Sequence, residues 1–434
     1  MDALSPASTA WLLTASALVL LMTPALAFFY GGLVRRKNAL NTMMMSFAAT
    51  GVVGVVWATL GYSLAFSPGN RWIGGLDYVL LRGVGLEANG EVPHLLFMTF
   101  QGTFAVITAA LISGAVAERM RFGAYLLFIA AWTLCVYAPV CHWVWGDGWL
   151  AALGALDFAG GTVVHVNAAA AAVVAALVVG ARRDHGRRAM LPHNVPFVLL
   201  GAGLLWFGWF GFNAGSALAA DGVAALAFAN TFFAPAAALT AWLLLDLLVT
   251  GRATAVGAAT GVVVGLVAIT PAAGFVSPAA SLAIGALAVG PSYWAILRRS
   301  RSRLDDSLEV AAAHGMGGIV GALLTGVFAG AAWGGASGLI EGGLAAGGRQ
   351  VAVQAVAVLG TLVYSGVASF LLLNMIGLVV PLRATSGDER RGLDGPQHGE
   401  QAYVDGDGAV LLLPDATPPA ERPQLTIEPA AATS

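Results

Sequence analysis

Long apolar runs, separated by short polar segments, recur along this chain of 434 residues. A helix crosses the apolar core of a bilayer in ~20 residues, because each residue advances the helix by ~1.5 Å. Runs of that length predict eleven membrane-spanning helices, at residues 9–34, 40–66, 94–117, 122–145, 157–180, 195–217, 223–249, 254–271, 278–297, 309–331 and 350–379. The runs at 254–271 and 278–297 are the least distinct, because glycine and proline interrupt them.

The composition supports a membrane protein over a soluble one. Hydrophobic residues make up 58% of the chain and charged residues only 10%, which is too little charge to cover the surface of a soluble protein. The formal net charge of −2 argues against nucleic acid as a partner. Glycine is abundant, and GxxxG spacings such as Gly261 to Gly265 let membrane helices approach closely. We therefore predict an all-α integral membrane protein.

The positive residues predict how the chain is threaded. If the first helix runs from outside to inside, the cytoplasmic loops hold fourteen cations, namely Arg35, Arg36, Lys37, Arg119, Arg121, Arg182, Arg183, Arg187, Arg188, Arg252, Arg298, Arg299, Arg301 and Arg303. The external loops then hold three, Arg71, Arg82 and Arg349. This bias predicts an external N-terminus and a cytoplasmic C-terminus. The apolar run continues past the signal-like PALA at 24–27, which favours a retained first helix over a cleaved leader.

Helices 1–5 and 6–10 are predicted to form two units of opposite orientation, followed by an eleventh helix. An odd number of spans per unit forces this inversion, which is common in transporters. The two units end in helices 5 and 10, each of which carries one histidine. Residues 1–380 form the predicted membrane domain, and the polar residues 381–434 form a cytoplasmic tail that we expect to be disordered after about residue 410.

His165 and His314 lie inside apolar helices, in DFAGGTVVHVN and VAAAHGMGG. An ionisable ring in the membrane is costly unless it lines a polar path or finds a partner. Two facing imidazoles in an apolar lumen suit a small neutral molecule that forms hydrogen bonds, and they exclude a bare ion by desolvation. The alternative is two unrelated buried histidines, each bonded to a carbonyl. An intramembrane metalloenzyme would need a third ligand, and none is suitably spaced, so we expect no metal, no cofactor and no catalytic residue.

Residues near the external helix ends suggest a cation site. Asp157 lies near the N-terminus of helix 5, where it caps backbone N–H groups, attracts a cation, or does both. Trp209, Phe212 and Ser216 share one face of helix 6. With Trp145 and Phe104 they would hold a cation by cation–π attraction and a hydrogen bond. Taken alone, these aromatic residues also fit a membrane-interface belt or simple packing.

Seven segments together resemble the ammonium transporter family (Amt/Mep, with the Rh proteins as distant relatives). They are FFYGGLVRRKN at 28–38, FQGTFA at 100–105, GAVAER at 114–119, DFAGGTVVH at 157–165, WFGFNAGS at 209–216, DDSLEVAAAHGMGG at 305–318 and GLDGPQHGEQAY at 392–403. The resemblance covers about residues 10–403. It implies an eleven-helix homotrimer in the plasma (inner) membrane, with one path per subunit and a tail that communicates with PII-type signalling proteins.

The same resemblance assigns roles by position. Phe104, Trp145 and Ser216 would recruit ammonium, with Asp157 as structural support; Phe104 and Phe212 would form a gate; and His165 and His314 would line the pore. The expected function is passage of ammonium or ammonia, with methylammonium as an analogue, and our hypothesis is net electrogenic uptake. The alternative is an ammonium sensor of the same fold that signals through its tail.

The chain departs from the family pattern in three places. Glu309 stands where an aspartate is usual, and Ala311–Ala313 replace a stretch that usually contains an aromatic residue. The tail has the insertion PLRATSG at 381–387 and places Gly395 and Pro396 inside the GLD…HGE run, which bears on any PII interaction.

Overall fold

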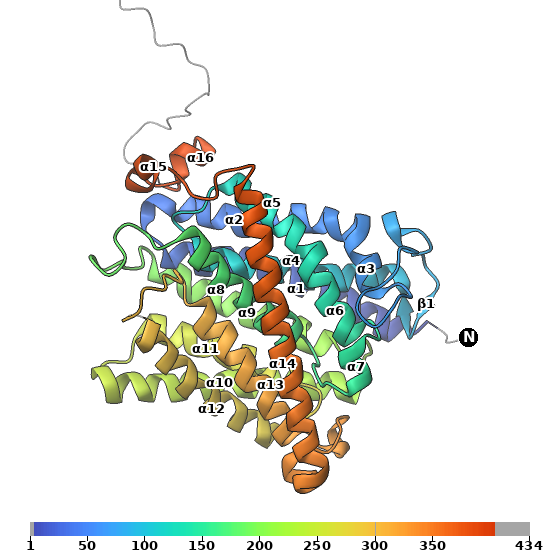
Figure 1. Ribbon diagram of the computed structural model, residues 1–434. Coiled ribbons are helices and arrows are strands. Elements are labelled where there is room, and N and C mark those ends of the chain that lie inside the picture. The colour runs from blue at the N-terminus through green and yellow to red at the C-terminus, as the bar shows by residue number, and fades with distance from the viewer. Residues whose placement is uncertain (1–3, 300, 404–434) are drawn as a thin grey trace, which may run out of the picture.

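A computed structural model describes residues 4–299 and 301–403 as a bundle of helices (Figure 1). The helices are α1 (Pro6–Leu33), α2 (Ala39–Val56), α3 (Tyr62–Phe66), α4 (His94–Val116), α5 (Phe122–Trp132), α6 (Ala138–Trp145), α7 (Trp149–Leu153), α8 (Asn167–Val179), α9 (Val195–Gly215), α10 (Gly222–Thr250), α11 (Ala255–Ile269), α12 (Pro278–Arg299), α13 (Gly317–Phe328), α14 (Leu339–Gly377), α15 (Ser386–Arg391) and α16 (Asp394–His398). π-helical turns at Trp57–Gly61, Thr133–Tyr137, Gly161–Val166 and Ala311–Met316 join or begin several of them. Strands β1 (Ala88–Asn89) and β2 (Val92–Pro93) form a short antiparallel pair.

The prediction of eleven spans is confirmed. In the described part of the chain, ten helical segments are long and apolar enough to cross a membrane, and the shorter apolar helix α11 is the eleventh. The last helix differs from the prediction of 350–379, because it begins at Leu339 and continues through a non-helical residue, Gly343. Figure 1 shows α14 crossing the front of the bundle at a steep angle to α10 and α12. The prediction of disorder after about residue 410 concerns residues outside the described part of the chain.

The packing follows the two inverted units. Helix α1 packs along α9, and these are the first helices of the two units. The π-helical turn that begins helix 5, Gly161–Val166, packs on α13, and its counterpart, Ala311–Met316, packs on α8. Each histidine-bearing turn therefore lies against the helix that follows the other one. This exchange brings the ends of the two units together at the centre of the bundle.

Small residues allow close contact between helices of the second unit. A Cβ added to Gly261 would lie 2.7 Å from Cβ of Trp242, and one added to Gly265 would lie 2.6 Å from Cβ of Ala238. Both distances are too short for real atoms, so any larger residue at these positions would push α11 away from α10. The GxxxG spacing therefore has the packing role expected in a membrane.

The loops rich in positive residues meet at one end of the bundle, called here the inner end. Arg35 bonds to Glu118, and Arg182 bridges Glu118 and Asp305 at 3.2 and 2.8 Å. Burial raises the pKa of Glu118, but Arg182 and Arg35 outweigh it and hold that pKa below its ordinary value. Four separate loops are thus held together by ion pairs to the buried carboxylates of Glu118 and Asp305.

The tail packs on this inner end. Asp394 accepts hydrogen bonds from the backbone N–H groups of Leu40 and Asn41, at 3.2 and 2.8 Å, so it caps the start of α2. The hydroxyl of Tyr403 lies 3.0 Å from Nε2 of His193. The other end, called the outer end, carries the β1–β2 pair and the start of α1, where the N–H of Ser5 donates to the Glu91 carbonyl at 2.9 Å.

Candidate functional site

The two intramembrane histidines face each other. The Nδ1 atoms of His165 and His314 lie 3.2 Å apart, and the rings are nearly parallel with centroids 5.2 Å apart. Both side chains are buried, at 2% and 3% exposure. A hydrogen bond between two Nδ1 atoms requires one donor and one acceptor, so the pair holds an ordered proton in the middle of the bundle. The sequence left open a facing pair or two unrelated buried histidines, and the structure has the facing pair.

Both rings project from π-helical turns, whereas the sequence predicted regular α-helix. The wider turn contains an extra residue, and such turns are frequent at functional sites. His165 lies in Gly161–Val166 and His314 in Ala311–Met316. Hydrophobic periodicity cannot distinguish one π turn from an α turn, so no sequence signal predicted them.

Asp157 fixes the first of these turns. Its two carboxylate oxygens accept hydrogen bonds from four consecutive backbone N–H groups, those of Gly160, Gly161, Thr162 and Val163, at 2.6 to 3.0 Å. The four free N–H groups at the start of a helix need such acceptors. The carboxylate is fully occupied by these bonds, so its geometry is that of a helix cap.

Asp306 has the matching place in the second unit and was missed in the sequence. It lies eight residues before His314, as Asp157 lies eight residues before His165. Its Oδ2 accepts the N–H of Ala311 at 2.7 Å, while its buried Oδ1 has no hydrogen-bond partner among the residues that the structure describes. The shared Asp-x7-His spacing was the signal that could have found it.

Two phenylalanine rings lie above the histidines toward the outer end. Phe104 and Phe212 stack with centroids 4.1 Å apart, and both rings are buried. Phe212 is also 6.1 Å from the ring of His165. The stack therefore separates the histidine pair from the outer end, as a gate would.

Trp145 stands at the outer side of this stack. Its ring is perpendicular to Phe104, with centroids 6.0 Å apart, and its Nε1–H donates to the Asp157 carbonyl at 2.8 Å. Ser216 ends α9, and its hydroxyl donates to the Phe212 carbonyl at 2.8 Å. Trp145 and Ser216 are only half-buried, as a site open to the outer end requires.

Trp209 lies in a different place from the other predicted cage residues. It is buried on the inner side of Phe212, where its ring stacks on His165 at 5.4 Å. Its Nε1–H donates to the hydroxyl of Thr270 at 2.9 Å. Both Trp209 and Phe212 contact His165 from one face of α9, but they follow one another along the helix axis, so they lie at different depths.

A narrow cavity follows the histidines. It has a volume of about 10 Å³, and its walls are apolar except for the two histidines and the indole of Trp209. A space of this size holds about one water-sized molecule. Apolar walls replace none of the hydration of a cation, so an ion entering the cavity would lose its solvation energy.

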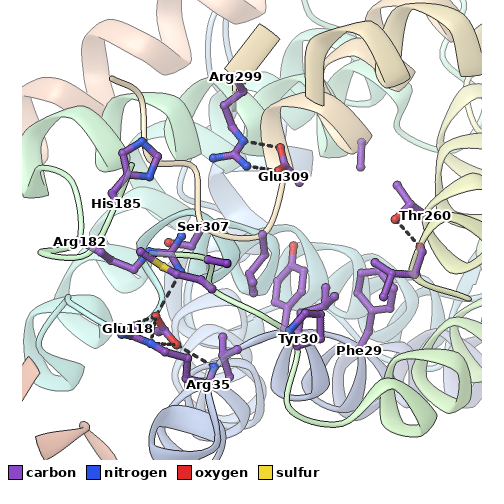
Figure 2. A pocket seen from close by; sticks show the side chains of 18 of the residues that line it. Phe29, Tyr30, Arg35, Glu118, Arg182, His185, Thr260, Arg299, Ser307 and Glu309 are labelled. Atoms are coloured by element: carbon purple, nitrogen blue, oxygen red, sulfur yellow. Dashed lines mark hydrogen bonds and ion pairs between the residues drawn. The ribbon is translucent and has the colours of Figure 1, made fainter. Parts of the chain in front are cut away.

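A larger cavity opens below His314 at the inner end (Figure 2). It has a volume of about 440 Å³ and is called here the inner vestibule. Phe29, Val263 and His314 line both cavities, so the vestibule and the narrow cavity meet at His314. Arg299 and Glu309, which flank the vestibule in Figure 2, form an ion pair there.

Within residues 4–299 and 301–403, no three His, Cys, Asp or Glu side chains come close enough to hold a metal ion. From the outer to the inner end the residues lie in the order of the half-buried Trp145 and Ser216, the stacked Phe104 and Phe212, the histidine pair with its narrow apolar cavity, and the charged inner vestibule.

Comparison with known proteins gives a consistent result. The family model described as Ammonium Transporter Family matches residues 10–403. The ammonium transporter of Bacillus subtilis is 48% identical over 403 residues, which is 92% of this chain and 98% of that protein. Mep2 of Saccharomyces cerevisiae has a similar solved structure, with a TM-score of 0.81 and 34% identity over 88% of each chain. A solved structure named Sensor Amt Protein has a TM-score of 0.84 and 30% identity, over 90% of this chain and 98% of that one.

Proposed function

The chain belongs to the ammonium transporter family and transports ammonium or ammonia across a membrane, and we propose that it does so by removing a proton from ammonium above the histidine pair. The single observation that carries this mechanism is the histidine contact of 3.2 Å inside a cavity of about 10 Å³. Such a space accepts ammonia and rejects a hydrated ion.

Recruitment takes place at the outer end. The half-buried Trp145 presents its ring face to an arriving cation, and Ser216 and Phe104 complete the site. An aromatic face holds a cation by ~0.5–2 kcal/mol, more where water is excluded. Because Asp157 is engaged by four N–H groups, its part is to hold Trp145 and the turn that carries His165 in place.

Selectivity arises at the next step. Potassium resembles ammonium in size and charge, so attraction to aromatic rings does not separate them well. Ammonium can transfer one proton to solvent water at the half-buried outer site and pass the Phe104–Phe212 stack as neutral ammonia, whereas potassium has no proton to give. The neutral molecule then exchanges hydrogen bonds with His165 and His314, while Trp209 forms the wall of the cavity. We propose that the proton follows separately, which makes uptake electrogenic.

The remaining assignments are also proposals. The gathering of arginines at the inner end supports a cytoplasmic inner end and an external N-terminus, in the plasma membrane. A homotrimer, and a PII-type partner at the tail, rest on the family resemblance. The sensor alternative predicts ammonium-dependent signalling with little flux.

Current measurement on proteoliposomes tests the transport mechanism. Ammonium pulses are expected to give a saturable current, methylammonium a smaller one, and potassium none. Equal currents for ammonium and potassium would overturn the deprotonation step. Ammonium binding without any flux would favour the sensor.

A further inference from the structure

The ion pair between Arg299 and Glu309 lies in the inner vestibule, at the point where a transported molecule leaves the histidines. Arg299 is in the last turn of α12, and Glu309 stands just before the π-helical turn that carries His314. Both residues line the same cavity as His314. In Figure 2 the guanidinium of Arg299 faces both oxygens of the Glu309 carboxylate.

The geometry of this pair leaves the carboxylate little capacity for another cation. Nε of Arg299 donates to Oε2 of Glu309 at 2.6 Å, and NH2 of Arg299 donates to Oε1. Two parallel bonds of this kind match the fork of the guanidinium to both carboxylate oxygens. The side chains are 18% and 23% exposed, so the pair is partly shielded from water.

The other carboxylate that lines the vestibule is engaged in the same way. Glu118 is bonded by Arg35 and Arg182 and has no side-chain exposure. The two lining carboxylates are thus each held by arginine. The vestibule also carries Arg188, so its walls bear more positive than negative side chains.

We infer that Arg299 keeps Glu309 from holding ammonium at the exit, and so speeds release of ammonium into the inner compartment. The inference rests on the proposed function, because it concerns the ammonium that re-forms when ammonia takes up a proton in the vestibule. An unpaired carboxylate beside His314 would bind that cation, and bound product would slow the next cycle. Because of Arg299, the inner end binds ammonium weakly, while the aromatic site at the outer end binds it more strongly.

The backbone conformation gives a second reason to think that the position of Glu309 matters. Its φ angle is 62°, in the left-handed region that side chains other than glycine rarely adopt. The ion pair links Glu309 to the last turn of α12 and holds the carboxylate in this position. If the ion pair only stabilised the fold, its loss would change transport from both sides alike. A change in transport from the inner side alone would therefore support the inference.

The test compares half-saturation concentrations from the two sides. Uptake of labelled methylammonium is measured in right-side-out vesicles, which report the outer end, and in inverted vesicles, which report the inner end. Arg299→Gln is expected to lower the inner half-saturation concentration about fivefold. A change of this size corresponds to the upper end of the energies measured for exposed ion pairs. The outer value is expected to stay within twofold of wild type.

Two further variants make the result specific. Arg298→Gln removes the exposed neighbouring arginine, which does not line the vestibule, and is expected to behave as wild type. Arg299→Gln combined with Glu309→Gln removes the freed carboxylate, so the inner value is expected to return toward wild type. An unchanged inner value in Arg299→Gln, or the same shift in the double variant, would overturn the inference. No saturable uptake by wild type from either side would instead overturn the proposed function.

Discussion

Replacement of Asp157 by alanine is expected to destabilise the protein far more than loss of an ordinary helix cap. The carboxylate is 6% exposed and accepts four backbone N–H groups. Alanine would leave all four donors without side-chain acceptors in a site where the carboxylate is buried. A hydrogen bond to a charged group contributes ~1.5–3 kcal/mol, but neighbouring bonds to one carboxylate do not add fully. We expect a loss of at least ~3 kcal/mol.

Asp221 provides the matched control. It caps α10 in the ordinary way, with one bond to the N–H of Ala224 at 2.9 Å, and it is exposed. Its replacement by alanine is expected to cost ~1 kcal/mol, the usual value for a cap. Asp157→Asn, which keeps one carbonyl acceptor, is expected to lie between the two alanine variants.

The measurement is unfolding of the purified protein in detergent, by titration with SDS and by thermal denaturation. Methylammonium uptake by the fraction that remains folded reports whether the turn that carries His165 has moved. Equal losses of stability in Asp157→Ala and Asp221→Ala would refute the reasoning, because the four bonds would then count no more than one. Full uptake by Asp157→Ala would show that the cap does not position the pore.

Three other changes test separate parts of the account. Trp145→Leu is expected to raise the outer half-saturation concentration for ammonium about fivefold, through loss of ~1 kcal/mol of cation–π attraction; unchanged affinity in current recordings would remove Trp145 from the recruitment site. Glu118→Gln is expected to cost ~2 kcal/mol, less than the ~3–5 of a fully isolated pair, because Arg35 and Arg182 keep other carboxylate partners. The pKa of Glu118 is lowered in the folded protein, so its contribution to the free energy of unfolding is present above the ordinary value of 4.5 and is lost as pH falls through the lowered pKa. The free energies of unfolding of wild type and Glu118→Gln are therefore expected to converge below that pH. A difference that stays constant with pH would contradict the pairing. Asp394→Ala is expected to release the tail from α2 and to speed proteolytic cleavage within residues 386–403; an unchanged cleavage rate would mean that other contacts hold the tail.

The sequence predicted the membrane architecture well because the determinants are local. Twenty apolar residues in a row have one stable arrangement in lipid, and the arginines between them are counted directly. The runs at 254–271 and 278–297 were the least distinct; the first corresponds to the short helix α11, whereas the second is a helix of full spanning length. The pairing of His165 with His314 was predictable because each residue lies in the last helix of one of two equivalent units.

The details of the site were less accessible from the sequence. The depth of Trp209 depends on the direction of the pore, which no periodicity reports. The π-helical turns depend on backbone bonding at Gly161–Val166 and Ala311–Met316, and the hydrophobic pattern is the same with or without them. The bond from Arg299 to Glu309 was also hidden, because the sequence contains many arginines and gives no means to choose among them.

The most direct test of the central claim is the current carried by ammonium and by potassium in proteoliposomes containing wild type or the double variant His165→Ala, His314→Ala. With wild type we expect ammonium current and no potassium current, because only a proton donor can enter the dry segment as a neutral molecule. The folded double variant is expected to lose this selective ammonium current. Selective ammonium current of wild-type size in the double variant would contradict the account.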